Sequence, residues 1–185
     1  AEVTGNVVIG SGAATEVGFM KAETVTLNGK GVTIGEAAVS EDLTVNSEAT
    51  AVITKANVGR NLIVASKGDT EIAEAIVEGD ASINSVGKIV ADTIRGGTIA
   101  FEAKEEIQLT AIESDGEISI ISGGDVIIST KAEVNSLKAE EELLDNKADY
   151  TNVFIAGKVN TNDSNFADDT GNAVLRSSNG DIHIE

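Results

Sequence analysis

The side chains best suited to binding a metal ion lie close together towards the C-terminal end of the sequence. This cluster consists of three aspartates and three asparagines: Asp163, Asp168 and Asp169 with Asn160, Asn162 and Asn165. Carboxylate and amide oxygens are the ligands that Ca²⁺ prefers. Their order differs from that of the helix-loop-helix calcium loop. Two interpretations therefore stay open: a calcium site and a solvated polar loop.

Other kinds of site chemistry find little support in the sequence. The sequence has one histidine, His183, and no cysteine, so it cannot build a thiolate zinc site, and a lone imidazole does not make a conventional one. It has no Gly-x-Ser-x-Gly motif, phosphate loop or dinucleotide fingerprint in a strand-turn-helix context. We therefore predict a protein that is not an enzyme and that needs no cofactor other than the candidate calcium ion.

The charge of the chain excludes several classes of partner. It carries 31 acidic and 13 basic side chains, for a formal net charge of −18. Such a chain repels nucleic acid and anionic membrane surfaces, and no stretch approaches eighteen apolar residues, so we expect no membrane insertion. The sequence starts at Ala1 without a hydrophobic leader, as a mature protein does after signal cleavage. We therefore expect a secreted or cell-surface protein.

The organisation of the chain is set by a repeat between residues 6 and 122. An apolar residue returns at steps of 18 or 19, and a second row two positions earlier keeps the same step. An apolar-x-apolar pair is typical of a strand with one buried face, and its recurrence near every twenty residues is typical of a solenoid. The first row comprises Ile9, Leu27, Val45, Val64, Ile83, Phe101 and Ile120; the second comprises Val7, Val25, Leu43, Leu62, Ala81, Ile99 and Ile118.

Two more lines of apolar residues share this period. One comprises Ile34, Ile53, Ile72, Val90, Leu109 and Ile128, and the other is the Ala-x-Val pair at residues 37–39, 56–58 and 75–77. Three short strands in each coil of about 18–19 residues predict an all-β, parallel β-solenoid with a roughly triangular cross-section. Proline, which cannot donate to a hydrogen-bond ladder, is absent from the sequence.

The length of the chain favours a single solenoid domain over residues 1–185. Regular coils are predicted for about residues 5–139, because Leu137 and Ala139 still fall on the two rows. Irregular coils and long loops are predicted for residues 140–185, with a short helix or a bulging loop over residues 138–149.

Two sets of residues are candidates for an assembly interface. A solenoid exposes bare strand edges at its ends, so we expect Val7, Ile9, Ile182 and Ile184 of the first and last strands to meet between copies. The residues in the middle of the first line of strands point outward and are uncharged, among them Thr26, Thr44, Ser82 and Ser119. This strip is a candidate for lateral packing; a smooth face without a partner and an ice-binding face are the alternatives.

Several strands resemble the repeats of filamentous haemagglutinin-type bacterial adhesins. Examples are Gly-Glu-Ile-Ser-Ile at 116–120, Gly-Asp-Val-Ile-Ile at 124–128 and Gly-Asp-Ile-His-Ile at 180–184. The resemblance implies a right-handed parallel β-helix on an extracellular fibre that serves adhesion or aggregation. Residues 22–29 also resemble the repeats of bactofilins, which are cytoskeletal β-helices.

Repeat, composition and resemblance together favour a structural subunit of an extracellular bacterial fibre or matrix. The predicted partner is a second copy, stacked head to tail by strand addition, and a host or neighbouring-cell surface is a further candidate. Two alternatives stay open. One is a monomeric ligand-binding module of a larger secreted adhesin, and the other is a bactofilin-like cytoskeletal filament protein.

Overall fold

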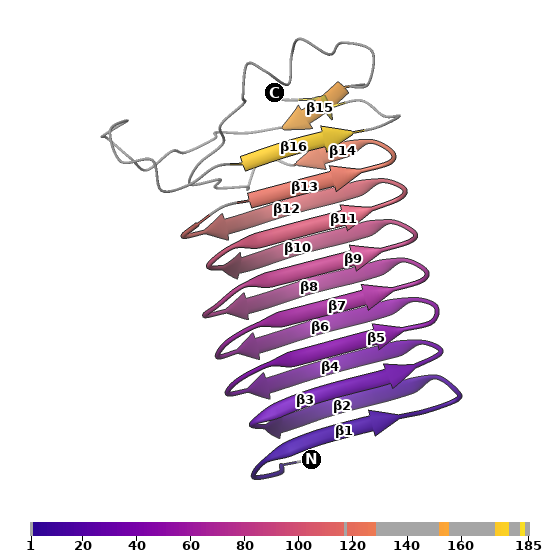
Figure 1. Ribbon diagram of the computed structural model, residues 1–185, viewed down its shortest axis with the longest axis vertical. Helices are drawn as coiled ribbons and strands as arrows, with labels where there is room; N and C mark the ends of the chain where they lie inside the picture. The colour runs from indigo at the N-terminus through magenta and orange to yellow at the C-terminus, as the bar shows by residue number, and fades with distance from the viewer. Residues whose placement is uncertain (1, 117, 129–151, 156–172, 178–181, 184–185) are drawn as a thin grey trace.

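The computed structural model describes residues 2–116, 118–128, 152–155, 173–177 and 182–183, and in them the chain winds into a parallel β-solenoid (Figure 1). Each regular coil contributes one short and one long strand, to two different sheets. Paired residues of successive coils are mostly 18 or 19 positions apart, as in Leu27 with Val45 and Val45 with Val64. Between residues 15–22 and 32–39 the step is 17. The predicted all-β solenoid and its coil length are thereby confirmed.

The first sheet, here called the short-strand sheet, has the order β1-β3-β5-β7-β9-β11-β13-β16. Its strands are β1 (Asn6–Gly10), β3 (Thr24–Gly29), β5 (Leu43–Ser47), β7 (Leu62–Ser66), β9 (Ala81–Ser85), β11 (Ile99–Ala103), β13 (Ile118–Ser122) and β16 (Ala173–Ser177).

The second sheet, here called the long-strand sheet, has the order β15-β17-β14-β12-β10-β8-β6-β4-β2. Its strands are β2 (Thr15–Ala22), β4 (Val32–Val39), β6 (Ala51–Val58), β8 (Thr70–Val77), β10 (Ile89–Gly96), β12 (Ile107–Ser114), β14 (Val126–Ile128), β15 (Asn152–Ile155) and β17 (Ile182–His183). In Figure 1 the short strands run in front from left to right and the long strands return behind while the chain rises. The coils are therefore right-handed, the usual sense for parallel crossovers.

The three predicted strands per coil are two in the structure, because the second and third apolar lines share one long strand. In β4, Ile34 and Ala37 are both buried, and the two residues between them, Gly35 and Glu36, both lie outside the core. The alternation of buried and outward-facing residues therefore changes phase in the middle of the strand, and each long strand contributes two walls to the core. With the short-strand sheet as the third wall, the cross-section is the expected triangle.

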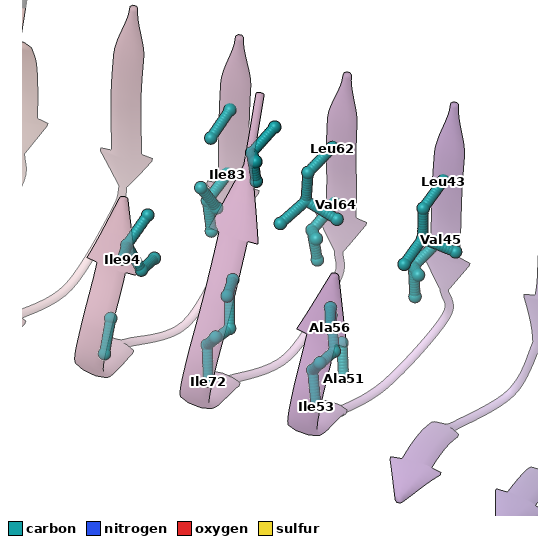
Figure 2. Packing of buried hydrophobic residues seen from close by; sticks show 14 of the residues in the cluster. Leu43, Val45, Ala51, Ile53, Ala56, Leu62, Val64, Ile72, Ile83 and Ile94 are labelled. Atoms are coloured by element: carbon teal, nitrogen blue, oxygen red, sulfur yellow. The ribbon is translucent and has the colours of Figure 1, made fainter. Parts of the chain in front are cut away.

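Stacked apolar columns fill the interior of the solenoid. Leu27, Val45, Val64, Ile83, Phe101 and Ile120 occupy one column and are at most 1% exposed. Figure 2 shows Leu62 and Val64 of one sheet directed toward Ile53 and Ala56 of the other. The core is narrow, which explains why small and branched side chains predominate over aromatic ones.

One assignment within these columns was wrong. Val90 was expected on the inward line, but Ala91 pairs with Ile72 and Leu109 there, and Val90 points outward between Glu71 and Gln108. The step from Ile72 to Ala91 is 19 residues and the next is 18. A shift of one residue in a strand reverses the face on which a side chain lies.

Beyond β14 the described strands extend the same two sheets. β16 continues the short-strand sheet by pairing Ile118 with Ala173, and β15 and β17 both pair with β14. The neighbour of β13 is thus β16. The expectations for Leu137, Ala139 and the segment 138–149 lie outside the described residues.

Candidate assembly surfaces

The predicted outward strip is a continuous ladder on the short-strand sheet. Each member pairs directly with the next along the solenoid axis: Val8, Thr26, Thr44, Ile63, Ser82, Ala100 and Ser119. Val8 is 72% exposed and Ile63 is 44% exposed. The structure therefore brings Thr26, Thr44, Ser82 and Ser119 together in one row, as the sequence predicted.

A second outward row lies beside the first and was missed by sequence reasoning. It comprises Gly10, Asn28, Asn46, Ala65, Asn84, Glu102 and Ile121. The amide Nδ2 of Asn46 donates to Oδ1 of Asn28 at 2.8 Å, and Nδ2 of Asn84 donates to Oε2 of Glu102 at 3.2 Å. A constant offset of two residues from the first row was the signal that could have revealed it.

Together these two rows, here called the uncharged face, hold a single ionisable side chain, Glu102, between β1 and β13. A shallow groove of about 390 Å³ runs along the second row and is open to solvent. Its lining includes Asn28, Asn46 and Asn84 of the second row and Glu48 and Lys67 of the neighbouring corners. The face thus offers amides, hydroxyls and aliphatic groups, which suit close contact with another neutral surface.

Charged residues lie instead on the long-strand sheet and at the corners. Lys55 and Glu74 on adjacent long strands form an ion pair at 3.2 Å, and Arg95 and Glu113 form another at 3.4 Å. These pairs are substantially exposed to solvent, so each contributes little to stability. Their position shows that the net charge is concentrated away from the uncharged face.

The N-terminal end of the solenoid exposes part of its core. Val7 and Ile9 of β1 and Val17 of β2 point inward but are only half-buried. The carbonyl of Gly5 accepts from the N–H of Glu23, and the N–H of Ser11 donates to the carbonyl of Asn28. Consecutive residues of a parallel strand bond alternately to either side. Val7 and Ile9 therefore bond to β3, and the N–H and C=O of Val8 point to the open edge.

Residues 2 and 3 cover one corner of this end. Glu2 forms a parallel bridge with Lys21, and the N–H of Val3 donates to the Lys21 carbonyl at 2.9 Å. A hydrogen bond of 2.8 Å from Lys21 Nζ to Glu2 Oε1 lowers the pKa of the Glu2 carboxyl below its usual value. The same pair raises the pKa of Lys21. This contact leaves the edge of β1 without a partner strand among the described residues.

Of the remaining candidates from the sequence, only Ile182 lies in the described residues. Ile182 lies in β17, which pairs with β14 and β15, whereas Ile184 and the calcium candidates Asp163, Asp168 and Asp169 lie outside the described residues. In the part of the chain that the structure describes, no three acidic, histidine or cysteine side chains gather as a metal site would require.

A search of the described residues for a helix long and apolar enough to cross a membrane found none. Comparisons of the chain with protein-family models, with curated proteins and with solved structures gave no match.

Proposed function

We propose that this chain is a non-catalytic structural subunit that assembles end to end by adding one solenoid to the next. The observation that carries the proposal is the edge of β1, where Val7 and Ile9 are only half-buried beside backbone groups that point outward. A strand from a second copy would pair with Asn6, Val8 and Gly10 and cover the open core. This is strand addition, in which backbone hydrogen bonds supply affinity and apolar pockets supply register.

Apolar burial supplies only part of the free energy of such a joint, and the backbone hydrogen bonds of the added strand must supply the rest. Burying the remaining surface of Val7, Ile9 and Val17 contributes about 1 kcal/mol for each side chain before the cost of association. The strongly acidic corners oppose disordered clustering and leave the edge and the uncharged face as the surfaces where copies can approach. An extracellular bacterial fibre or matrix that serves adhesion or aggregation is the role we propose for the resulting filament.

The test is negative-stain microscopy and light scattering of the whole chain, with and without Ca²⁺. We expect uniform fibres from the unmodified chain. Val8→Pro removes an N–H that points to the open edge and costs no bond to β3, because proline is tolerated at sheet edges. This variant should therefore fold normally and form no fibres, whereas the control Val8→Thr keeps the N–H and should assemble.

A monodisperse particle of one chain mass from the unmodified chain would overturn the proposal and favour the ligand-binding alternative. Fibres of unchanged length from Val8→Pro would show that β1 is not the joint. A requirement for Ca²⁺ would direct attention to Asp163, Asp168 and Asp169. Cell fractionation separates the extracellular fibre from a bactofilin-like filament, which would remain inside the cell.

A further inference from the structure

The uncharged face has the chemistry of a surface that is covered in the working protein. In a chain with a net charge of −18, its two rows carry one carboxylate, Glu102. Val8, Ile63 and Ile121 expose 72%, 44% and 42% of their surface on it. We propose that two copies of this chain pair through this face, side by side and with their solenoid axes parallel. The inference does not depend on end-to-end assembly.

The two margins of the face differ in charge. The residues just before the short strands are mostly acidic and include Glu23, Asp42 and Asp80. The residues just after them mix lysines with carboxylates, so that this second margin is nearly balanced: Lys30, Lys67, Lys88 and Lys104 with Glu48, Asp69, Glu105, Glu106 and Asp125. Arg60 bonds Glu41 and Asp42 at 3.3 and 3.4 Å, and Lys67 pairs with Glu48 at 3.7 Å.

This arrangement of margins selects one symmetry. A two-fold axis parallel to the solenoid axis places the mixed margin of one copy opposite the acidic margin of the other. A two-fold axis along the strands would instead place the acidic margin of one copy against the acidic margin of the other. Two identical copies form a closed pair only through such an axis, at which the same patch is used twice. The parallel pair avoids setting two acidic margins against each other, so the charges of the rim favour it over the alternative.

The parallel pair also gives a consistent contact at the centre. Within each coil the axis passes between the two outward rows, so Ile63 lies opposite Ala65 of the other copy. The amide row of Asn28, Asn46 and Asn84 then meets the row of hydroxyls and small side chains. A second copy would thus fill the shallow groove beside these asparagines.

The area of the face is adequate for a specific interface. Seven coils at about 4.8 Å give a length of about 30 Å, and the strand with its margins gives a width of about 20 Å. Two such faces bury on the order of 1,200 Å² in total, which is the lower end of the range for stable protein pairs. A dissociation constant in the micromolar range is the expected strength.

The first experiment is sedimentation of the whole chain carrying Asn6→Pro, so that end-to-end assembly does not contribute. Asn6 is the first residue of β1 and lies outside both rows of the face, and its N–H also points to the open edge, where proline is tolerated. We expect a concentration-dependent dimer. Ile63→Glu places a carboxylate at the centre of the face and should weaken dimerisation at least 100-fold. The matched control is Ile76→Glu, because Ile76 is 41% exposed on β8 of the other sheet and should leave the dimer unchanged. A monomer before mutation, or equal effects of both variants, would overturn the proposal.

Cross-linking then tests the orientation, and the absence of natural cysteine makes it simple. Ser119→Cys and Thr26→Cys are made separately and treated with a short bis-maleimide that joins thiols about 10 Å apart. In the parallel pair each of these residues lies near the same residue of the other chain, so both variants should give covalent dimers. In the opposite orientation the two copies of residue 119 would lie about 30 Å apart. Failure of Ser119→Cys to cross-link would contradict the parallel arrangement.

Discussion

The hydroxyl of Ser85 donates to the carbonyl of Gly68, in the preceding coil, at 2.5 Å. The carbonyl of Lys88, 3.1 Å away, shares the single proton of this hydroxyl, so one buried side chain links two successive corners. Ser66 and Ser122 repeat the contact with Ala49 and Glu105 at 2.5 and 2.6 Å. These serines stack as a ladder inside the corner that follows each short strand.

Removing one step of this ladder should lower the stability of the solenoid. Ser85→Ala removes one of the two hydrogen bonds that the Gly68 carbonyl accepts and leaves it the bond from the Gly87 N–H at 3.1 Å. We expect the free energy of unfolding to fall by about 0.5–1.5 kcal/mol. Urea denaturation followed by far-UV circular dichroism measures the change. Stability equal to that of the unmodified chain would show that water replaces the hydroxyl at this corner.

The ladder has a natural gap at Ala103, which is 4% exposed and pairs with Ser85 and Ser122. Ala103→Ser adds a hydroxyl in the position from which its neighbours bond the preceding corner, so we expect a gain of about 0.5–1 kcal/mol. Comparison of the urea midpoints of Ala103→Ser and the unmodified chain measures this gain. A loss of stability would mean that the corner at residues 86–88 has no acceptor in reach.

Thr70 presents the opposite case, because its buried hydroxyl has no hydrogen-bond partner. The side chain is 0% exposed and pairs with Ala51 and Ile89 in a column that is apolar except for Thr15 in the first coil. Thr70→Val keeps the shape and removes the unsatisfied oxygen, so the free energy of unfolding should rise by about 1 kcal/mol. Thr33→Val on the exposed face of β4 is the control and should change stability by less than about 0.5 kcal/mol.

The close approach of successive coils predicts a steric effect at Gly59. A Cβ atom added there would collide with the carbonyl oxygen of Ser40, whereas a Cβ at Gly12 would meet no atom within 4 Å. Gly59→Ala should therefore destabilise the fold by about 1–3 kcal/mol, and Gly12→Ala should not. Thermal denaturation of the pair checks this difference. Equal midpoints would show that the corner shifts at no cost.

The columns of the core could be predicted from the sequence because burial in a strand has a strict period of two residues. The apolar residue type of Leu27 and Val45, and of most of their partners, is enough to predict that these positions are buried. The number of strands could not be predicted, since the bend between Ile34 and Ala37 leaves the long strand continuous. The spacing of apolar residues predicts which residues face inward. It does not predict whether the backbone hydrogen-bond ladder continues between two such residues.

The candidate interface was only half predictable for a related reason. Thr26 and Ser82 were recognised because the middle residue of each short strand has a fixed place between two buried ones. The second row mixes Gly10, Ala65 and Glu102 with asparagines, so no single property marks it. Its neutrality emerges only when the register places these residues side by side.

A column of polar side chains at the other corner supports a final prediction about charge. Asn61 Nδ2 donates to Asp42 Oδ1 at 3.0 Å, and Asn61 Oδ1 accepts from the N–H of Asp80 at 3.1 Å. The amide therefore separates two carboxylates on alternate coils. Asn61→Asp removes the donor and places three carboxylates about 4.8 Å apart along the axis.

We expect Asn61→Asp to lower the free energy of unfolding by about 1–2 kcal/mol at neutral pH. Repulsion raises the pKa of the new carboxyl in the folded state above its unfolded value, because the charged form is disfavoured there. The repulsive part of the loss is therefore present above the folded pKa and disappears as pH falls below the unfolded pKa. Asn61→Thr is the control, because threonine already occurs in this column. Thr98 lies two coils after Asn61, and its backbone N–H donates to Asp80 Oδ1 at 2.9 Å. A loss in Asn61→Asp that persists unchanged at pH 3 would show that the missing amide donor, and not repulsion, governs this corner.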